Sequence, residues 1–203
     1  MKLNLPNKLT VLRLCLVPVL IVFGMLPRGL INYYVWCVVC AALFIAISVT
    51  DMLDGRIARK RNMITDFGKF LDPVADKFLV IGAMFVLLYQ LEQFRLAMII
   101  TLIAVVFREL AVTSMRLVVS TGEGIVIAAN SLGKIKTVSQ IVFVSTAFLE
   151  PVAEWLLMLL WKTYPLCGVY PLTWLTMVFS VFMTVWSGVN YLKAYWKYLD
   201  PEK

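Results

Sequence analysis

Six long apolar segments alternate with short polar ones along this chain of 203 residues. The apolar segments are centred near Val17, Phe44, Phe85, Ile103, Val142 and Phe179. Segments of this length and hydrophobicity are typical of membrane-spanning helices. The pattern therefore predicts an all-α polytopic membrane protein with six transmembrane helices, folded as a single domain over residues 1–203.

Five of the six segments become polar at the same end. The fourth is uncharged only over residues 96–107, which is too short to cross a bilayer, so its helix is expected to continue through Arg108, Glu109 and Arg116. Charges at membrane depth are tolerated where they face water or one another. We therefore expect the five polar ends to enclose a hydrated cavity. The sixth segment, residues 169–192, is interpreted as a plain anchor, and Glu150 in the fifth is given no role.

Composition excludes an ordinary soluble domain, because 62% of the residues are hydrophobic and only 15% are charged. The net charge of +7 raises the question of a nucleic-acid partner. With both termini placed in the cytoplasm, however, only Arg28, Arg95 and Lys162 among the Lys and Arg residues fall on the opposite side. The positive-inside rule then predicts a plasma-membrane protein whose termini and polar cavity are cytoplasmic, and basic residues that orient it and contact membrane lipids rather than nucleic acid.

Four carboxylates stand at the cavity end of the second and third segments: Asp51, Asp54, Asp72 and Asp76. On a helix the first two lie about 60° apart and the last two about 40° apart, so each pair forms one acidic face. The short connection makes the two helices antiparallel neighbours with both faces at one level. Carboxylate oxygens favour Mg²⁺ or Mn²⁺, and zinc is disfavoured because the chain contains no His.

Small residues and an arginine follow the first carboxylate pair. Gly55 and Ala58 remove bulk, which would let a flat group such as a base or ribose lie against the helix, and Arg59 offers a planar fork for a phosphate oxygen. Together with the carboxylates, this pattern indicates a site for a metal-bound nucleotide diphosphate.

The pattern Asp51-x-x-Asp54-Gly55-x-x-Ala58-Arg59, eight residues, then Gly68-x-x-x-Asp72-x-x-x-Asp76 resembles the signature of the CDP-alcohol phosphotransferase family. The resemblance implies an integral membrane enzyme that binds two Mg²⁺ or Mn²⁺ ions through the four Asp and transfers a group from a CDP-linked donor to a hydroxyl. It also implies that Asp76 is both a metal ligand and the base that deprotonates the attacking hydroxyl.

The resemblance extends to donor contacts. It implies that the donor, CDP-diacylglycerol, is bound by Asn7, Thr10, Gly55, Ala58, Arg59, Thr65 and Gly68. Asn7 and Thr10 belong to a Pro-Asn-x-x-Thr-x-x-Arg segment. Members of the family often begin with a similar segment, which resembles a lid over the nucleotide of the donor. From the residues alone, the same polar edge is equally well interpreted as an anchor at the membrane interface.

A cationic group follows in the fourth and fifth segments: Arg108, Arg116, Lys134 and Lys136, with Thr137 beside them. Such cations require an anionic partner, which is either a substrate or Asp66, Glu109, Glu123 and lipid phosphates. The segment resembles the family members whose acceptor is glycerol 3-phosphate. The resemblance implies that these five residues bind the acceptor phosphate and that the products are phosphatidylglycerophosphate and CMP.

Other functions are weighed against this one. The same donor could serve inositol phosphate, serine or phosphatidylglycerol, although an uncharged acceptor would leave the cations unexplained. A divalent-cation transporter would also contain membrane carboxylates, but it predicts inverted repeats and polar residues on both halves, and neither is visible. A non-catalytic lipid-binding protein would not need all four Asp. Members of the family often form homodimers, a state that the sequence itself does not predict.

Overall fold

The computed structural model describes residues 5–27, 29–60, 66–122, 131–161 and 168–196, and the side chains of residues 52–60 lie outside the described part. All regular secondary structure among the described residues is helical. The long helices are α1 (Leu5–Gly24), α2 (Tyr33–Lys60), α3 (Asp66–Gln90), α4 (Arg95–Gly122), α5 (Ser131–Trp161) and α6 (Pro171–Tyr195), with a short 3₁₀ turn, η1 (Glu92–Phe94), before α4. Each predicted apolar segment has its centre in a helix of its own, and α4 continues past Arg116 as expected.

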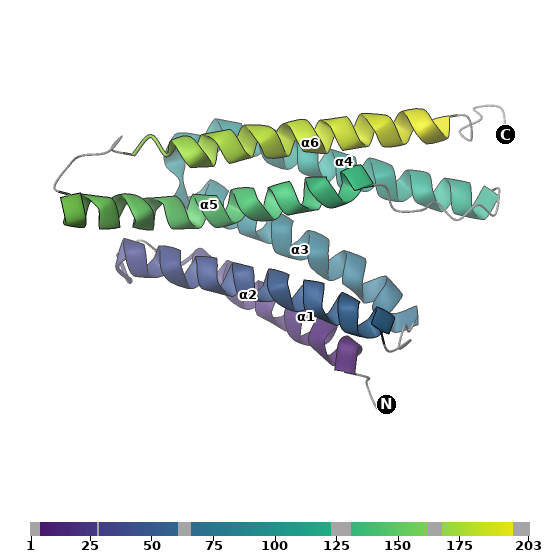
Figure 1. Ribbon diagram of the computed structural model, residues 1–203, viewed down its shortest axis with the longest axis horizontal. Coiled ribbons are helices and arrows are strands. Elements are labelled where there is room, and N and C mark those ends of the chain that lie inside the picture. Colours follow the sequence, from purple (N-terminus) through teal and green to yellow (C-terminus); the bar gives the residue numbers. More distant parts are fainter. Residues whose placement is uncertain (1–4, 28, 61–65, 123–130, 162–167, 197–203) are drawn as a thin grey trace.

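The six helices form a bundle in which consecutive helices run in opposite directions (Figure 1). Helix α1 packs on α2 and α3, whereas α5 packs on α2, α3 and α6, and α4 packs on α3 and α6. The C-terminal ends of α2, α4 and α6 therefore lie at the same end of the bundle as the N-terminal ends of α1, α3 and α5. That end carries the polar stretches that the sequence pattern places together.

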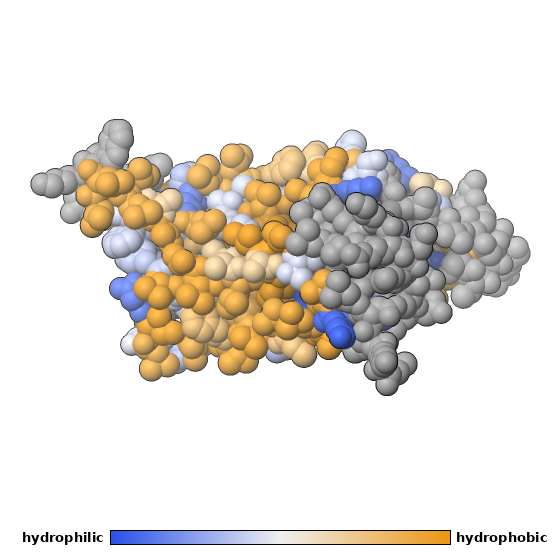
Figure 2. Space-filling view, turned by 60° about the horizontal axis from the view of Figure 1, so that its bottom comes forward, coloured by the Kyte–Doolittle hydropathy of each residue, from blue (hydrophilic) through white to orange (hydrophobic). Residues whose placement is uncertain are grey.

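Five of the helices in the described part, α1, α2, α4, α5 and α6, are long and apolar enough to cross a membrane. Helix α3, whose first half carries Asp72, Asp76 and Lys77, is not counted among them. Large apolar side chains cover much of the described surface (Figure 2), for instance Leu96, which is 73% exposed, and Phe107, which is 71% exposed. Such a surface is typical of a protein surrounded by lipid.

The interior is built from apolar side chains of all six helices, including Leu20, Phe44, Met84 and Phe143, all fully buried. Two glycines allow α1 and α3 to approach closely. A Cβ added at Gly24 would lie 2.5 Å from Val86 Cγ1, and one added at Gly82 would lie 2.6 Å from Ile21 Cδ1. Small residues at helix contacts permit this kind of packing in membranes. The packing fixes α1 against α3.

A buried carboxylate of α5 caps the N-terminus of α6. Glu150 is 6% exposed and accepts hydrogen bonds from the backbone amides of Leu172 (2.8 Å) and Thr173 (2.7 Å) and from Thr173 Oγ1 (2.6 Å). These amides belong to the first turn of α6, where no carbonyl of the same helix can accept them. Glu150, to which the sequence assigned no role, thus caps a neighbouring helix and fixes α5 against α6.

Candidate functional site

The acidic residues meet at the end of the bundle where α2 ends and α3 begins. Asp51 comes from α2, and Asp72 and Asp76 come from consecutive turns of α3, as their four-residue spacing requires. The side chains of Asp51 and Asp76 are 38% and 43% exposed. The carboxylates are therefore partly open, and the predicted meeting of the two acidic faces is found for the three Asp side chains that are described.

Arg13 of α1 joins the two acidic helices. Its Nη1 lies 2.5 Å from Asp51 Oδ1 and 3.0 Å from Asp76 Oδ1, and its side chain is 0% exposed. A buried guanidinium is stable only when carboxylates compensate its charge. Arg13 was not among the residues predicted for the site, although its three-residue spacing from Thr10, on a helix that contacts α3, indicates that the two share a face.

Thr10 makes the second link from α1 to the acidic site. Its hydroxyl donates a hydrogen bond of 2.7 Å to Asp72 Oδ1. Asn7, Thr10 and Arg13 are all buried, with exposed fractions of 7% or less. This polar edge of α1 therefore faces α2 and α3, which is not the arrangement expected of an anchor that lies along the membrane surface.

Several residues predicted to bind the CDP-linked donor or a metal ion lie where the structure describes no side chain. Asp54, Gly55, Ala58 and Arg59 lie in α2, but their side chains are not described, and Thr65 lies outside the described residues altogether. Gly68 is described and is buried near the start of α3.

The described side chains of the acidic site suit a hard divalent cation as ligands, because they are partly exposed carboxylates and include no His or Cys. Among the described side chains, no three acidic, His or Cys residues are close enough to hold a metal ion by themselves.

A second, cationic cluster lies where α3, α4 and α5 meet. Glu109 of α4 accepts a short charge-assisted hydrogen bond from Lys136 Nζ of α5, and a bond of 3.0 Å from Arg108 Nη1. Lys77 Nζ of α3 lies 3.9 Å from Glu109 Oε2. Arg108 and Lys136, both predicted acceptor residues, are therefore brought together, and the carboxylate between them is one of the alternative partners that the sequence left open.

Helix α6 supports Arg108 and Arg116 of α4, so it is more than the plain anchor expected from its apolar sequence. Arg108 donates from Nε and Nη2 to Ser187 Oγ at 3.2 and 3.0 Å. Arg116 Nε donates to the Tyr191 hydroxyl at 2.8 Å, and its guanidinium lies 5.3 Å from the ring centroid. A Cβ added at Gly188 would lie 3.1 Å from Arg108 Cγ, so this glycine leaves room for the arginine.

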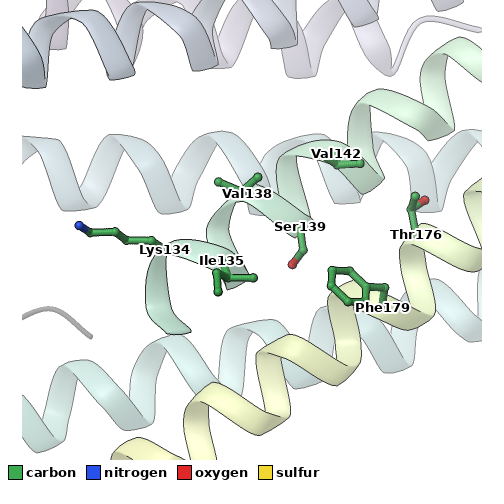
Figure 3. Close-up of a pocket in the computed structure, with 7 residues that line it drawn as sticks. All are labelled: Lys134, Ile135, Val138, Ser139, Val142, Thr176 and Phe179. Atoms are coloured by element: carbon green, nitrogen blue, oxygen red, sulfur yellow. The ribbon is translucent and has the colours of Figure 1, made fainter. Parts of the chain in front are cut away.

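The two remaining residues predicted to bind the acceptor phosphate are Thr137 and Lys134. Thr137 donates to the backbone carbonyl of Gly133 in its own helix at 3.1 Å. Lys134 is exposed at one end of an apolar groove between α5 and α6, with its ammonium directed away from Phe179 (Figure 3). The groove has a volume of about 290 Å³ and is lined by Lys134, Ile135, Val138, Ser139, Val142, Thr176 and Phe179. Lys134 and Lys136 therefore leave α5 on different faces.

The two clusters adjoin along α3, because Asp76 belongs to the acidic site and the next residue, Lys77, belongs to the cationic cluster. The fold and these two clusters define a helical membrane protein with a carboxylate cluster beside a cationic cluster. This class is consistent with chemistry on phosphate groups at a membrane.

Comparison with known proteins gives the family. The sequence pattern of the CDP-alcohol phosphatidyltransferase family matches residues 3–186, and the chain belongs to this family. It is 41% identical over 203 residues to a protein of Bacillus subtilis (strain 168) named "CDP-diacylglycerol--glycerol-3-phosphate 3-phosphatidyltransferase", with 97% of each chain covered. A protein of the same name from Yersinia enterocolitica is 32% identical over 205 residues, which cover 99% of this chain and all of the relative.

Proposed function

We propose that this protein transfers the phosphatidyl group of CDP-diacylglycerol to sn-glycerol 3-phosphate, forming phosphatidylglycerophosphate and CMP. The observation that carries the proposal is the contiguity of Asp76 and Lys77, which sets a carboxylate centre for the donor beside cations for an anionic acceptor. The names of the Bacillus and Yersinia relatives support the same pair of substrates.

Asp51, Asp54, Asp72 and Asp76 would hold two Mg²⁺ or Mn²⁺ ions, in accord with the carboxylate chemistry of the described three. The bound ions would neutralise negative charge on the donor pyrophosphate. Arg13 and Thr10 hold Asp51, Asp72 and Asp76 in place from α1, so that the carboxylates keep their spacing. We assign to Thr10 this supporting role in addition to the donor contact that the resemblance implies.

Asp76 is the proposed base. Its carboxylate takes the proton from a hydroxyl of glycerol 3-phosphate while the hydroxyl oxygen forms a bond to the β-phosphorus of CDP-diacylglycerol. The bond from that phosphorus to the bridging oxygen breaks, and CMP leaves with the electron pair. Such a transfer depends on positioning and charge neutralisation more than on covalent catalysis. The partial exposure of Asp76 leaves it accessible to an acceptor.

Substrate contacts follow from the same arrangement. The donor would lie against Asn7, Thr10, Gly55, Ala58, Arg59, Thr65 and Gly68. Arg108 and Lys136, joined through Glu109, would bind the acceptor phosphate. Arg116, Lys134 and Thr137 complete the set of acceptor residues that the resemblance implies. Arg116 bonds to Tyr191, Lys134 lies at the α5–α6 groove, and Thr137 bonds to its own helix.

The membrane arrangement belongs to the proposal too. All six helices, including α3, would cross the bilayer of the plasma membrane as one domain over residues 1–203, with both termini and the polar cavity on the cytoplasmic side. The distribution of Lys and Arg residues supports this orientation. A cavity open to the cytoplasm and flanked by lipid can join a lipid donor to a soluble acceptor. A homodimer, as in other family members, is compatible with this arrangement.

The test is CMP release from CDP-diacylglycerol by the purified protein with Mg²⁺. Glycerol 3-phosphate is compared with inositol phosphate, serine and phosphatidylglycerol as acceptors. Release that depends on glycerol 3-phosphate supports the proposal. Release with another acceptor alone would retain the donor chemistry and overturn the assigned acceptor, and no release with any acceptor would overturn both.

A further inference from the structure

Glu109 joins cations from three helices. Its carboxylate accepts hydrogen bonds from Lys136 of α5 and Arg108 of α4, and Lys77 of α3 lies 3.9 Å from its Oε2. The Glu109 side chain is 12% exposed. Three cations are thus assembled around one carboxylate, which the sequence pattern identified only as an alternative partner.

The surrounding hydrogen bonds hold this cluster in a defined geometry. Lys77 Nζ also donates to Thr113 Oγ1 at 2.6 Å, and Thr113 Oγ1 donates to the backbone carbonyl of Glu109 at 2.7 Å. The Lys136 side chain is 6% exposed, so its charge depends on the adjacent carboxylate for compensation. Without Glu109, three like charges would face one another in a poorly hydrated site.

The charge of the cluster selects a class of ligand. Three cations and one carboxylate leave a net charge of +2, by count of these four side chains. A phosphate monoester carries about −1.5 to −2 near neutral pH and has three strong acceptor oxygens. A neutral alcohol or a singly charged acid would leave part of the charge uncompensated. The cluster therefore matches a phosphate monoester.

We propose that Glu109 is a positioning residue that sets the spacing of Lys77, Arg108 and Lys136 for a phosphate monoester and so makes the acceptor site selective for that class. Lys77 is thereby added to the acceptor site. This inference rests on the proposed function. Because Lys77 follows Asp76 in α3, a phosphate held here would bring its hydroxyl-bearing end toward the proposed base.

The first test uses Glu109→Gln, which keeps the side-chain size and removes the charge. The KM for glycerol 3-phosphate is expected to rise by about tenfold, while kcat and the KM for CDP-diacylglycerol stay within about twofold. Glu92→Gln is the matched control. Glu92 is 76% exposed, and its ion pair is with Arg95, which is not part of the cluster around Glu109. An unchanged or lower KM for glycerol 3-phosphate in Glu109→Gln would overturn the inference.

A double-mutant cycle separates positioning from general stability. If Glu109 acts through Lys136, Glu109→Gln should raise the KM much less in a Lys136→Met background than in the native one. Additive effects would contradict the proposed role. Should Glu109→Gln fail to fold, Glu109→Asp keeps the charge and withdraws it by one methylene, and it should raise the same KM by a smaller factor. An unchanged KM in that variant would count against the inference.

Binding of inorganic phosphate, measured as a rise in melting temperature of the detergent-solubilised protein, provides a readout without turnover. The apparent Kd for phosphate is expected to rise about tenfold in Glu109→Gln and to stay unchanged in Glu92→Gln. Equal phosphate affinity in Glu109→Gln and the native protein would contradict the inference even if the enzyme is active. Absence of glycerol 3-phosphate-dependent CMP release from the native protein, with phosphate binding lost in Glu109→Gln, would instead overturn only the proposed function.

Discussion

Arg13 contacts Asp76 through Nη1 at 3.0 Å, from a side chain that solvent does not reach, and the same nitrogen contacts Asp51. One residue of α1 therefore sets the distance between α2 and α3 at the acidic site. A carboxylate pair held in this way keeps its geometry whether or not substrate is present, which favours rapid positioning of the reacting groups.

Replacing Arg13 by Gln should lower both stability and activity. The loss of the buried cation leaves Asp51 and Asp76 to repel each other, at an expected cost of about 2 kcal/mol in unfolding free energy, less than for a fully buried pair because both carboxylates are partly exposed. Melting temperature and CMP release measure the two effects. Arg95→Gln, which breaks an exposed ion pair, is the control and should change neither. A fully active Arg13→Gln would contradict the supporting role.

Asp76→Asn should abolish turnover and spare donor binding, because the amide cannot accept the proton but occupies the same space. The expected loss in kcat is about a hundredfold or more. CMP release and binding of CDP-diacylglycerol are measured on the same preparation. Near-normal turnover would rule out Asp76 as the base.

Ser187→Ala should raise the KM for glycerol 3-phosphate by about threefold, since Arg108 loses the two contacts that orient its guanidinium from α6 but keeps its bond to Glu109. Ser180→Ala provides the comparison within the same helix. Ser180 is fully buried, and its Oγ has no hydrogen-bond partner in the described part of the chain. Its replacement should leave the KM unchanged, and equal effects of the two substitutions would argue against the role of Ser187.

Gly24→Ala should destabilise the protein more than Gly82→Ala. The new methyl at residue 24 meets Val86, which is branched at Cβ and has little freedom to turn away, whereas the methyl at residue 82 meets the far end of the Ile21 side chain. Gly29→Ala is the control, because nothing lies within 4 Å of its added Cβ. Melting temperatures of the three variants test the order, and a larger fall for Gly82→Ala would refute it.

Glu150→Ala should lower the unfolding free energy by about 3 kcal/mol, because two backbone amides and a hydroxyl lose a charged acceptor in a buried position. The KM values should stay unchanged, since the cap lies about four helical turns along α5 from Lys136. Glu92→Gln again serves as the control. A melting temperature equal to that of the native protein would show that α6 is held by its apolar contacts alone.

The six helices could be predicted from the sequence, because the length of an apolar segment and its helical period are local properties of the chain. The same period placed Asp72 and Asp76 on one face. The role of Arg13 was not predictable from local pattern, since Asp76 lies 63 residues away in the sequence. Ser187 and Tyr191 were missed because isolated polar groups are common in an apolar helix. For Lys134 and Lys136 a signal existed: residues two apart lie about 200° apart on a helix, so the two side chains leave α5 on different faces.

The ion pair of Arg13 also constrains how the protein is made. Helix α1 is synthesised and meets the membrane before Asp51 and Asp76 exist. A lone arginine in an apolar segment weakens insertion, by about 2.5 to 3.5 kcal/mol at mid-bilayer and by less near the interface. Stable integration of α1 should therefore depend on α2 and α3, whose carboxylates compensate the charge of Arg13. Burial of this arginine then coincides with assembly of the acidic site.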